Sequence, residues 1–383
     1  MGKTILILGG GVGGLVVANE LRAKLKPEHQ IILVDREASF VFSPSLLWLM
    51  TGDRTAEKIS RPLSRLQKKG IEVVTGEVAH IDPAARSALV QDRTIAADYI
   101  VVALGAELAP EAIPGLAEAG HNFYALSGAR SFAESFAMFR GGRLAVLTAA
   151  PAYKCPAAPY EAAMLLEYAC RKRGMRKETN IALYAAEPGP MGVAGPDVSK
   201  AVRQMVEAKG VEYHPEHQIV SADPAKRVLK FSNNTQTNYD LLAYVPPHRA
   251  PQVVRSAGML LETGWLPVHR NTLETRFPGV YALGDVTGIP LTLGKPLPKA
   301  GVFAHAQGLV IARNIAREIT GKGKPAQFSG DGECFIETGD GKAGFGAGNF
   351  YGEPVPQVKV HPPARRWHAA KVLFEKDWLR RWF

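Results

Sequence analysis

A run of glycines between an apolar strand and a helix constrains the fold of this chain more than any other feature. Residues 4–8 (TILIL) are all apolar or β-branched, as in a strand buried within a parallel sheet, and they lead directly into residues 9–14 (GGGVGG). A helical pattern follows, and then a second apolar strand over residues 31–34, which ends at Asp35. The order strand, glycine turn, helix, strand and acid is typical of a dinucleotide-binding α/β unit.

Each glycine of this turn has a distinct predicted role. Gly9 makes the tight turn, Gly11 lets backbone amides approach a pyrophosphate, and Gly14 lets the helix pack closely on the strand. Asp35 then accepts a hydrogen bond from a ribose hydroxyl, which favours an unphosphorylated adenosine ribose, as in FAD or NAD. Arg36 is a candidate cofactor contact, and a solvated neighbour of the acid is the simpler interpretation of it.

Two later strands distinguish between FAD and NAD. Residues 98–106 (DYIVVALGA) and 275–285 (TRFPGVYALGD) resemble the flavin-side signatures of the flavoproteins that contain two dinucleotide-binding domains. The resemblance implies FAD in the first domain, with Asp285 near its ribityl or pyrophosphate region. Lys299 is a candidate to stabilise negative charge on the reduced flavin, and an exposed lysine is the alternative. The remaining candidate FAD contacts are Ser43, Val78, Ala103, Gly105, Gly284 and Gly301.

The order of the motifs predicts the domain organisation. We expect an α/β fold with two Rossmann-like domains of the disulfide-oxidoreductase flavoprotein type. Residues 1–107 and 263–320 form the FAD-binding domain, and residues 108–262, with their own alternation of strands and helices, form the second domain. Residues 321–383 form a C-terminal region of different composition.

The second domain lacks the turn that a nicotinamide nucleotide needs. Its first predicted strand, residues 143–150, is followed by residues 151–161 (PAYKCPAAPYE), which contain no glycine. The prolines in this segment also remove amide donors that a phosphate cradle would use. The sequence therefore disfavours NADH as the electron donor.

Three cysteines are too few and too scattered for a disulfide framework or a zinc site, and no histidine pair has the spacing of metal ligands, so we expect no metal. Cys155 lies in the proline-containing turn, at the start of a helix predicted from about Pro159, where amide dipoles would stabilise a thiolate. Cys170 lies within that helix and is interpreted as a packed structural residue.

The segment KCPAAPYE around Cys155 resembles the active-site segment of sulfide:quinone oxidoreductases and of the flavoprotein subunit of flavocytochrome c sulfide dehydrogenases. Cys334 resembles the second redox cysteine of these families, and the resemblance extends over essentially the whole chain, including residues 42–52. Ordinary buried thiols are the alternative interpretation of the two cysteines. No cysteine precedes Cys155, which departs from members with covalent FAD or three redox cysteines, so noncovalent FAD is expected.

The resemblance also implies a mechanism. Hydrosulfide attacks a Cys155–Cys334 disulfide or trisulfide, which leaves a persulfide and a thiolate, and the electrons pass to FAD. The family pattern places the persulfide on Cys155 and the flavin-facing thiolate on Cys334, but the sequence does not order them. Glu161 is the candidate general base, and a glutamate stabilised by the helix dipole is the equally weighted alternative.

The end of the chain is basic and amphipathic. Residues 364–383 carry six Lys or Arg against Glu375 and Asp377, a net +4 out of the chain's +10. Their apolar residues recur at a spacing of three to four, which predicts a helix docked on an anionic lipid surface. The apolar positions are Trp367, Ala370, Phe374, Trp378 and Trp382. Packing on the protein's own core, or in a dimer, is the alternative, and no nucleic-acid module accompanies the charge.

Membrane docking points to a lipid-soluble quinone as electron acceptor, with Phe335, Phe345 and Phe350 as candidate lining residues. No run reaches the roughly 18 apolar residues of a membrane span, and no secretory signal is evident, so a peripheral protein of the inner membrane is expected. The alternatives are a sulfide dehydrogenase that donates to cytochrome c, a type II NADH:quinone oxidoreductase and a non-enzymatic FAD protein. The sequence leaves quinone type, sulfur chain length, membrane face and oligomeric state open, a homo-oligomer included.

Overall fold

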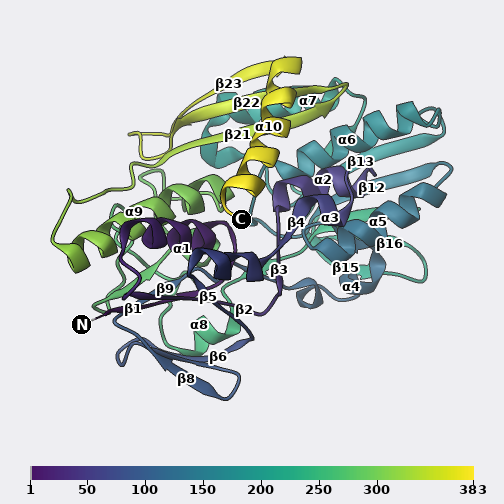
Figure 1. Ribbon diagram of the computed structural model, residues 1–383. Coiled ribbons are helices and arrows are strands. Elements are labelled where there is room, and N and C mark those ends of the chain that lie inside the picture. The colour runs from purple at the N-terminus through teal and green to yellow at the C-terminus, as the bar shows by residue number, and fades with distance from the viewer. Residues whose placement is uncertain (1) are drawn as a thin grey trace.

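A parallel sheet built from both halves of the chain forms the first layer of the computed structural model, which describes residues 2–383 (Figure 1). Its strand order is β20-β9-β1-β2-β5, and β1 pairs in parallel with both β9 and β2. The strands are β1 (Thr4–Leu8), β2 (Gln30–Asp35), β5 (Glu72–Thr75), β9 (Tyr99–Val102) and β20 (Val280–Ala282). The predicted strands over residues 4–8 and 31–34 are thus present.

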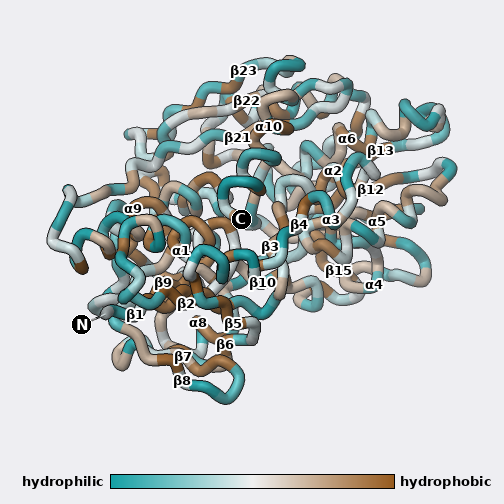
Figure 2. The backbone as a smooth tube through the Cα atoms, in the orientation of Figure 1, coloured by the Kyte–Doolittle hydropathy of each residue, from teal (hydrophilic) through white to brown (hydrophobic). Residues whose placement is uncertain are grey.

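Two long helices cover one face of this sheet. Helix α1 (Val12–Lys24) follows the glycine turn, and α9 (Gly301–Thr320) packs directly against it. Both helices bury an apolar face, because Leu15, Val16 and Ile311 are fully inaccessible to solvent. Figure 2 shows the most hydrophobic segments gathered on the strands beneath them.

A second five-stranded parallel sheet has the order β11-β18-β12-β13-β14. Its strands are β11 (His121–Asn122), β12 (Gly142–Thr148), β13 (Thr179–Ala185), β14 (Glu212–His214) and β18 (Leu241–Val245), and its helices are α5 (Leu126–Met138), α6 (Ala158–Lys172) and α7 (Pro196–Glu207). The strand and helix predicted on either side of Cys155 agree with β12 and α6 to within one or two residues.

Short elements complete the two α/β units. An antiparallel three-stranded sheet accompanies each of them. These elements are β3 (Ser39–Val41), α2 (Leu46–Met50), α3 (Ala56–Ile59), β4 (Ser60–Pro62), β6 (Val78–Asp82), β7 (Ser87–Val90), β8 (Arg93–Ala96), β10 (Glu107–Leu108), α4 (Leu116–Ala119), β15 (Ile219–Asp223), β16 (Val228–Phe231), β17 (Gln236–Asn238), β19 (His248–Arg249) and α8 (Gln252–Ser256).

The C-terminal region forms an antiparallel sheet, which no sequence pattern indicated, and the amphipathic helix predicted within residues 364–383. The sheet contains β21 (Asp331–Gly339), β22 (Lys342–Asn349) and β23 (Gln357–Ala364). It packs on α6 through β21, and helix α10 (Arg365–Arg381) leads from it back toward α1 and α9 (Figure 1). At the end of this helix the Trp382 carbonyl accepts a hydrogen bond from Asn19 of α1.

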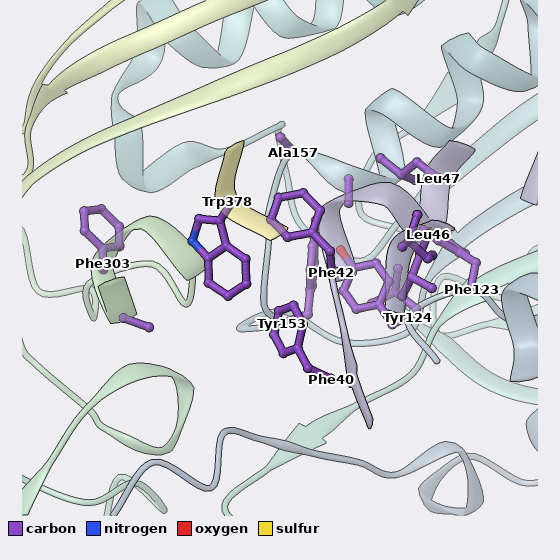
Figure 3. Packing of buried hydrophobic residues seen from close by; sticks show 14 of the residues in the cluster. Phe40, Phe42, Leu46, Leu47, Phe123, Tyr124, Tyr153, Ala157, Phe303 and Trp378 are labelled. Atoms are coloured by element: carbon purple, nitrogen blue, oxygen red, sulfur yellow. The ribbon is translucent and has the colours of Figure 1, made fainter. Parts of the chain in front are cut away.

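The expectation that the whole apolar stripe of α10 faces a membrane is wrong for its two C-terminal tryptophans. Trp378 and Trp382 are 4% and 3% exposed, because Trp378 stacks on Phe40 at 4.8 Å between ring centroids and contacts Phe42 (Figure 3). The exposed apolar residues are instead Leu373 and Phe374, at 66% and 45%. In the described part of the chain, no helix is long and apolar enough to cross a membrane.

Candidate active site

The glycine turn after β1 has the geometry of a nucleotide cradle. Gly9 has a φ of +109°, and a Cβ at Gly14 would lie 1.9 Å from the Gly9 carbonyl oxygen, so the close approach of helix and strand requires both glycines. A Cβ at Gly11, by contrast, would have no atom within 4 Å. The space beside Gly11 is open to a group that approaches the backbone, as the sequence predicts for a pyrophosphate.

Asp35 is held at the end of β2 by two backbone amides. Gly10 donates to Oδ2 at 2.6 Å and Glu37 donates to Oδ1 at 2.8 Å. The carboxylate is therefore fixed next to the glycine turn, where an adenosine ribose would lie. Arg36 points into solvent, with its side chain 72% exposed, and its guanidinium lies 3.6 Å from Glu37. Its position matches the interpretation as a solvated neighbour.

Asp285 and Lys299 are buried together after β20. Lys299 Nζ donates to the carbonyl oxygens of Asp285 at 2.7 Å and Thr287 at 3.0 Å, and it lies 3.2 Å from the centroid of the Trp265 ring. Burial lowers the pKa of Lys299 to about 8, so the alternative of an exposed lysine is wrong. Asp285 Oδ1 is buried without a hydrogen-bond partner. A bound polar group such as a ribityl hydroxyl would satisfy this oxygen.

The other candidate FAD contacts lie in different environments. Ala103 and Gly105 follow β9, and Gly284 follows β20, so all three are at the same edge of the sheet as the glycine turn. Ser43 and Gly301 are exposed at the starts of helical segments. Val78 is buried at the start of β6 in the apolar core.

Cys155 lies in the loop between β12 and α6 with its backbone held by three hydrogen bonds. Its amide donates to the Lys299 carbonyl at 2.6 Å, and its own carbonyl accepts from the Tyr124 hydroxyl at 2.9 Å and the Ala158 amide at 3.0 Å. Burial and, after it, the nearby Glu161 carboxylate raise the pKa of the Cys155 thiol to about 12. Desolvation therefore works against the thiolate that the sequence predicts at the start of the helix.

Cys334 lies on β21 in the same charged surroundings as Cys155. Its pKa is raised well above its ordinary value by burial and, after that, by the charges of Cys155 and Glu161. Both thiols are free in the structure. The packing of β21 on α6 brings the two cysteine segments together, although the two cysteines are 179 positions apart in the sequence. Cys170 is fully buried within α6, as expected of a structural residue.

Helix α10 supplies the partner of Glu161. Lys371 Nζ donates to Glu161 Oε1 at 2.7 Å, and both side chains are almost completely buried. The backbone amide of Glu337 donates to the same oxygen at 2.8 Å. The Glu337 carboxylate lies 3.0 Å from His368 Nδ1. The negative charge of Glu161 is therefore stabilised by a buried lysine and a backbone amide, and not by the helix dipole alone.

Lys371, Glu337 and His368 join the site without having been predicted from the sequence. Lys371 and Glu375 lie four residues apart between Trp367 and Trp378, so charges of opposite sign share the face of the tryptophans. That pattern was a signal of buried ion pairs. In the structure Glu375 pairs with Arg54 at 3.1 Å, and Arg54 and Lys371 both lie over the ring of Trp48.

The three phenylalanines predicted to line a quinone site are not all in one place. Phe335 and Phe345 contact each other at 5.2 Å between centroids, and Phe345 stacks on Trp367 at 4.5 Å. Phe350 instead packs edge-on against Phe303, beside α9. Phe374 joins the first group through Phe335 at 6.4 Å, and the sequence analysis assigned it only to the lipid-facing stripe.

Comparison with known proteins identifies the family. A family model described as pyridine nucleotide-disulphide oxidoreductase matches residues 3–308. The sulfide-quinone reductase of Aquifex aeolicus (strain VF5) is 29% identical over 407 residues, with coverage of 99% of this chain and 91% of that protein. The mitochondrial sulfide:quinone oxidoreductase of Mus musculus is 24% identical, with coverage of 88% and 75%.

The same similarity holds in three dimensions. The X-ray structure of the sulfide:quinone oxidoreductase from Aquifex aeolicus aligns with a TM-score of 0.89 and 25% sequence identity, with coverage of 99% of this chain and 91% of that one. The predicted resemblance and the predicted α/β fold are confirmed, and the matches imply a flavoprotein oxidoreductase. The match over residues 3–308 shows that the chain belongs to the pyridine nucleotide-disulphide oxidoreductase family.

Proposed function

We propose that this protein oxidises sulfide at Cys155 and Cys334 and passes the electrons through noncovalently bound FAD to a membrane quinone. The carrying observation is that Cys155 and Cys334, both half-buried, lie close enough to the buried Glu161–Lys371 ion pair for its charges to act on both thiols. The similar proteins named as sulfide:quinone oxidoreductases support the substrate and the acceptor. Gly11, Asp35 and Asp285 are the residues that would hold the FAD, which supplies a two-electron acceptor.

The chemistry starts from a sulfur bridge between the two cysteines. Hydrosulfide attacks one sulfur and the bridge breaks, so that one cysteine carries a persulfide and the other leaves as a thiolate. Joining the thiolate sulfur to the outer sulfur of the persulfide makes a trisulfide, which is a two-electron oxidation and would require FAD, when bound, as the electron acceptor. The proton of the persulfide goes to a base. Repeated turnover lengthens the sulfur chain until zero-valent sulfur leaves.

The charged pair beside the cysteines fits the two needs of this sequence of steps. The Glu161 carboxylate, whose charge acts on both cysteines, is positioned to take the proton of the incoming sulfide or of the persulfide. The Lys371 ammonium lowers the pKa of both cysteines, against the larger effect of burial, so it stabilises whichever thiolate forms. A lone thiol in this environment would stay protonated.

The structure gives no support to the NADH-dependent alternative. The loop after β12 contains no glycine, and one of its amides, that of Cys155, is already bonded to the Lys299 carbonyl. A nucleotide phosphate at that turn would need free amides and a close backbone approach.

The proposed acceptor site and membrane contact both lie at the exposed side of α10. Phe335, Phe345 and Phe374 form an aromatic group, and Phe374 is 45% exposed on α10 next to exposed Leu373. A quinone ring from the bilayer would enter beside these two residues, and the exposed cations of α10 would face lipid phosphates. A cytochrome acceptor predicts instead that quinone analogues are not reduced.

An anaerobic reduction experiment tests the proposal. The purified yellow protein receives sulfide in one cuvette and NADH in another while the visible flavin absorbance is followed. Bleaching by sulfide alone, lost in Cys155→Ser and Cys334→Ser and kept in the matched control Cys170→Ser, supports the proposed route. Bleaching by NADH and not by sulfide overturns it, and so does sulfide bleaching that survives both cysteine substitutions.

A further inference from the structure

One carboxylate of the second domain accepts hydrogen bonds from three side-chain hydroxyls. Glu187 Oε2 accepts from Thr148 Oγ1 at 2.8 Å. Glu187 Oε1 accepts from the Tyr160 hydroxyl at 2.7 Å and also from the Tyr153 hydroxyl. Burial keeps the pKa of both tyrosines well above 10, so both hydroxyls remain donors. A carboxylate with this many protein donors is fixed in one orientation.

Glu187 occupies the position in the second domain that Asp35 occupies in the first domain. Strands β12 and β13 run in parallel, as β1 and β2 do, and Glu187 follows β13 as Asp35 ends β2. Asp35 accepts hydrogen bonds from backbone amides, which leaves lone pairs for a ribose. The oxygens of Glu187 are occupied by the hydroxyls of the protein itself. Glu187 therefore holds parts of the second domain together through these hydrogen bonds.

The three hydroxyls tie Glu187 to both ends of the segment that carries Cys155. Tyr153 lies two residues before Cys155, and Tyr160 lies five residues after it and directly before Glu161. The backbone on either side of Tyr153 is unusual, because Ala152 and Cys155 have positive φ values of +68° and +49°. Non-glycine residues keep such a conformation only where the surrounding contacts enforce it.

We propose that Glu187 is a positioning residue for Cys155. Its carboxylate fastens the cysteine loop to the ends of β12 and β13 through Tyr153 and Tyr160, and so fixes the distance between the Cys155 sulfur, its partner thiol and the flavin. The inference rests on the proposed function, because it takes Cys155 as the sulfur that reacts with sulfide. The same arrangement explains why the second domain keeps an acid at the nucleotide position without a glycine turn.

Anaerobic stopped-flow reduction of the full-length flavoprotein by sulfide tests the proposal. Glu187→Leu removes the acceptor for all three hydroxyls at similar volume, and it should lower the limiting rate of flavin reduction by about tenfold or more, because small misplacements of reacting groups are costly. The sulfide concentration at half-saturation, the FAD content and reduction by dithionite should not change. Tyr153→Phe should reproduce most of the loss, and Glu187→Gln, which keeps one acceptor oxygen, should restore most of the rate.

Matched controls separate this proposal from the proposed function and from general destabilisation. Tyr184→Phe removes a buried hydroxyl of β13 whose partner is Thr237, far from the loop in sequence, and it should leave the rate unchanged. Wild-type rates in Glu187→Leu and Tyr153→Phe, with Cys155→Ser inactive, would overturn the positioning role alone. Equal losses in Tyr184→Phe and Tyr153→Phe would also overturn it. Full activity of Cys155→Ser would instead contradict the proposed function.

Discussion

Buried charges decide the chemistry of the site at the scale of single residues. Lys371 and Glu161 are nearly inaccessible to solvent, and their ion pair lies among cysteines whose pKa values burial raises. Each charge is tolerable because the other is 2.7 Å away. The pair therefore has a structural role beside the stabilisation of thiolate charge that we propose for it, and the two roles can be separated by experiment.

Removing one member of the pair should destabilise the protein more than removing both. Lys371→Met leaves Glu161 charged and unpaired, and we expect a loss of about 3–5 kcal/mol in the free energy of unfolding. The double variant Lys371→Met with Glu161→Gln should recover much of that loss, because no uncompensated charge remains. Urea unfolding at pH 7 measures both values. Equal stability of the single and double variants would contradict the buried pair.

His248 should make the stability depend on pH. Burial lowers its pKa from 6.5 to about 3, and its Nε2 is buried without a partner, so the folded protein keeps it neutral. Between pH 6.5 and pH 3 the unfolded chain binds this proton and the folded one does not, so the contribution is complete above pH 6.5 and lost as the pH falls. Urea unfolding at pH 7.5 and pH 5 should show a smaller decrease for His248→Gln than for the wild type.

At the scale of elements, helix α10 has two faces with different tasks. One face carries Trp378, Trp382 and Lys371 into the core and the site, and the other exposes Leu373 and Phe374. The helix therefore covers the candidate site as part of the folded protein, whatever its outer face contacts. A description of α10 as a detachable membrane anchor does not fit these contacts.

Truncation of the inner face of α10 should be far more costly than truncation of the outer face. Trp378→Ala removes a buried ring that stacks on Phe40 and contacts Phe42, and we expect a loss of about 3–5 kcal/mol. Leu373→Ser changes a side chain that is 66% exposed and should alter stability by no more than about 0.5 kcal/mol. Thermal unfolding of the two variants decides the matter, and similar midpoints would contradict the docked position of α10.

At the scale of the whole molecule, the distribution of charge identifies the surface that we propose contacts a membrane. The chain carries a net charge of +10, and cations exposed on α10 lie beside Leu373 and Phe374. Binding that combines exposed apolar residues with cations depends on both lipid charge and salt. This surface is the one that the proposed quinone entry requires to lie at the bilayer.

The protein should co-sediment with anionic vesicles and should stay in the supernatant with neutral phosphatidylcholine vesicles. The double variant Arg365→Glu with Arg366→Glu reverses two exposed charges, and each lost cation should weaken binding by about 1 kcal/mol, or roughly fivefold. Added salt should weaken the binding of the wild type in the same direction. Equal sedimentation of the variant and the wild type would contradict contact through α10.

Local sequence patterns determined much of the fold. The strand before residues 9–14, the acid Asp35 and the helix after Cys155 were predicted because period, glycine and proline act within a few residues. The resemblance around Cys155 and Cys334 likewise located both candidate cysteines. A sequence read in this way specifies which chemical groups are present and on which elements they lie.

Only the tertiary structure decided the surroundings of those groups. Lys371 and Glu161 are 210 positions apart, and Tyr153 and Glu187 meet only because β12 and β13 lie side by side. Burial, which raises the pKa of Cys155 and places Trp378 in the core, depends on what packs over a residue from elsewhere in the chain. Desolvation and ion pairing are properties of the packed interior, so neither the protonation of the cysteines nor the inner face of α10 could be read from local pattern.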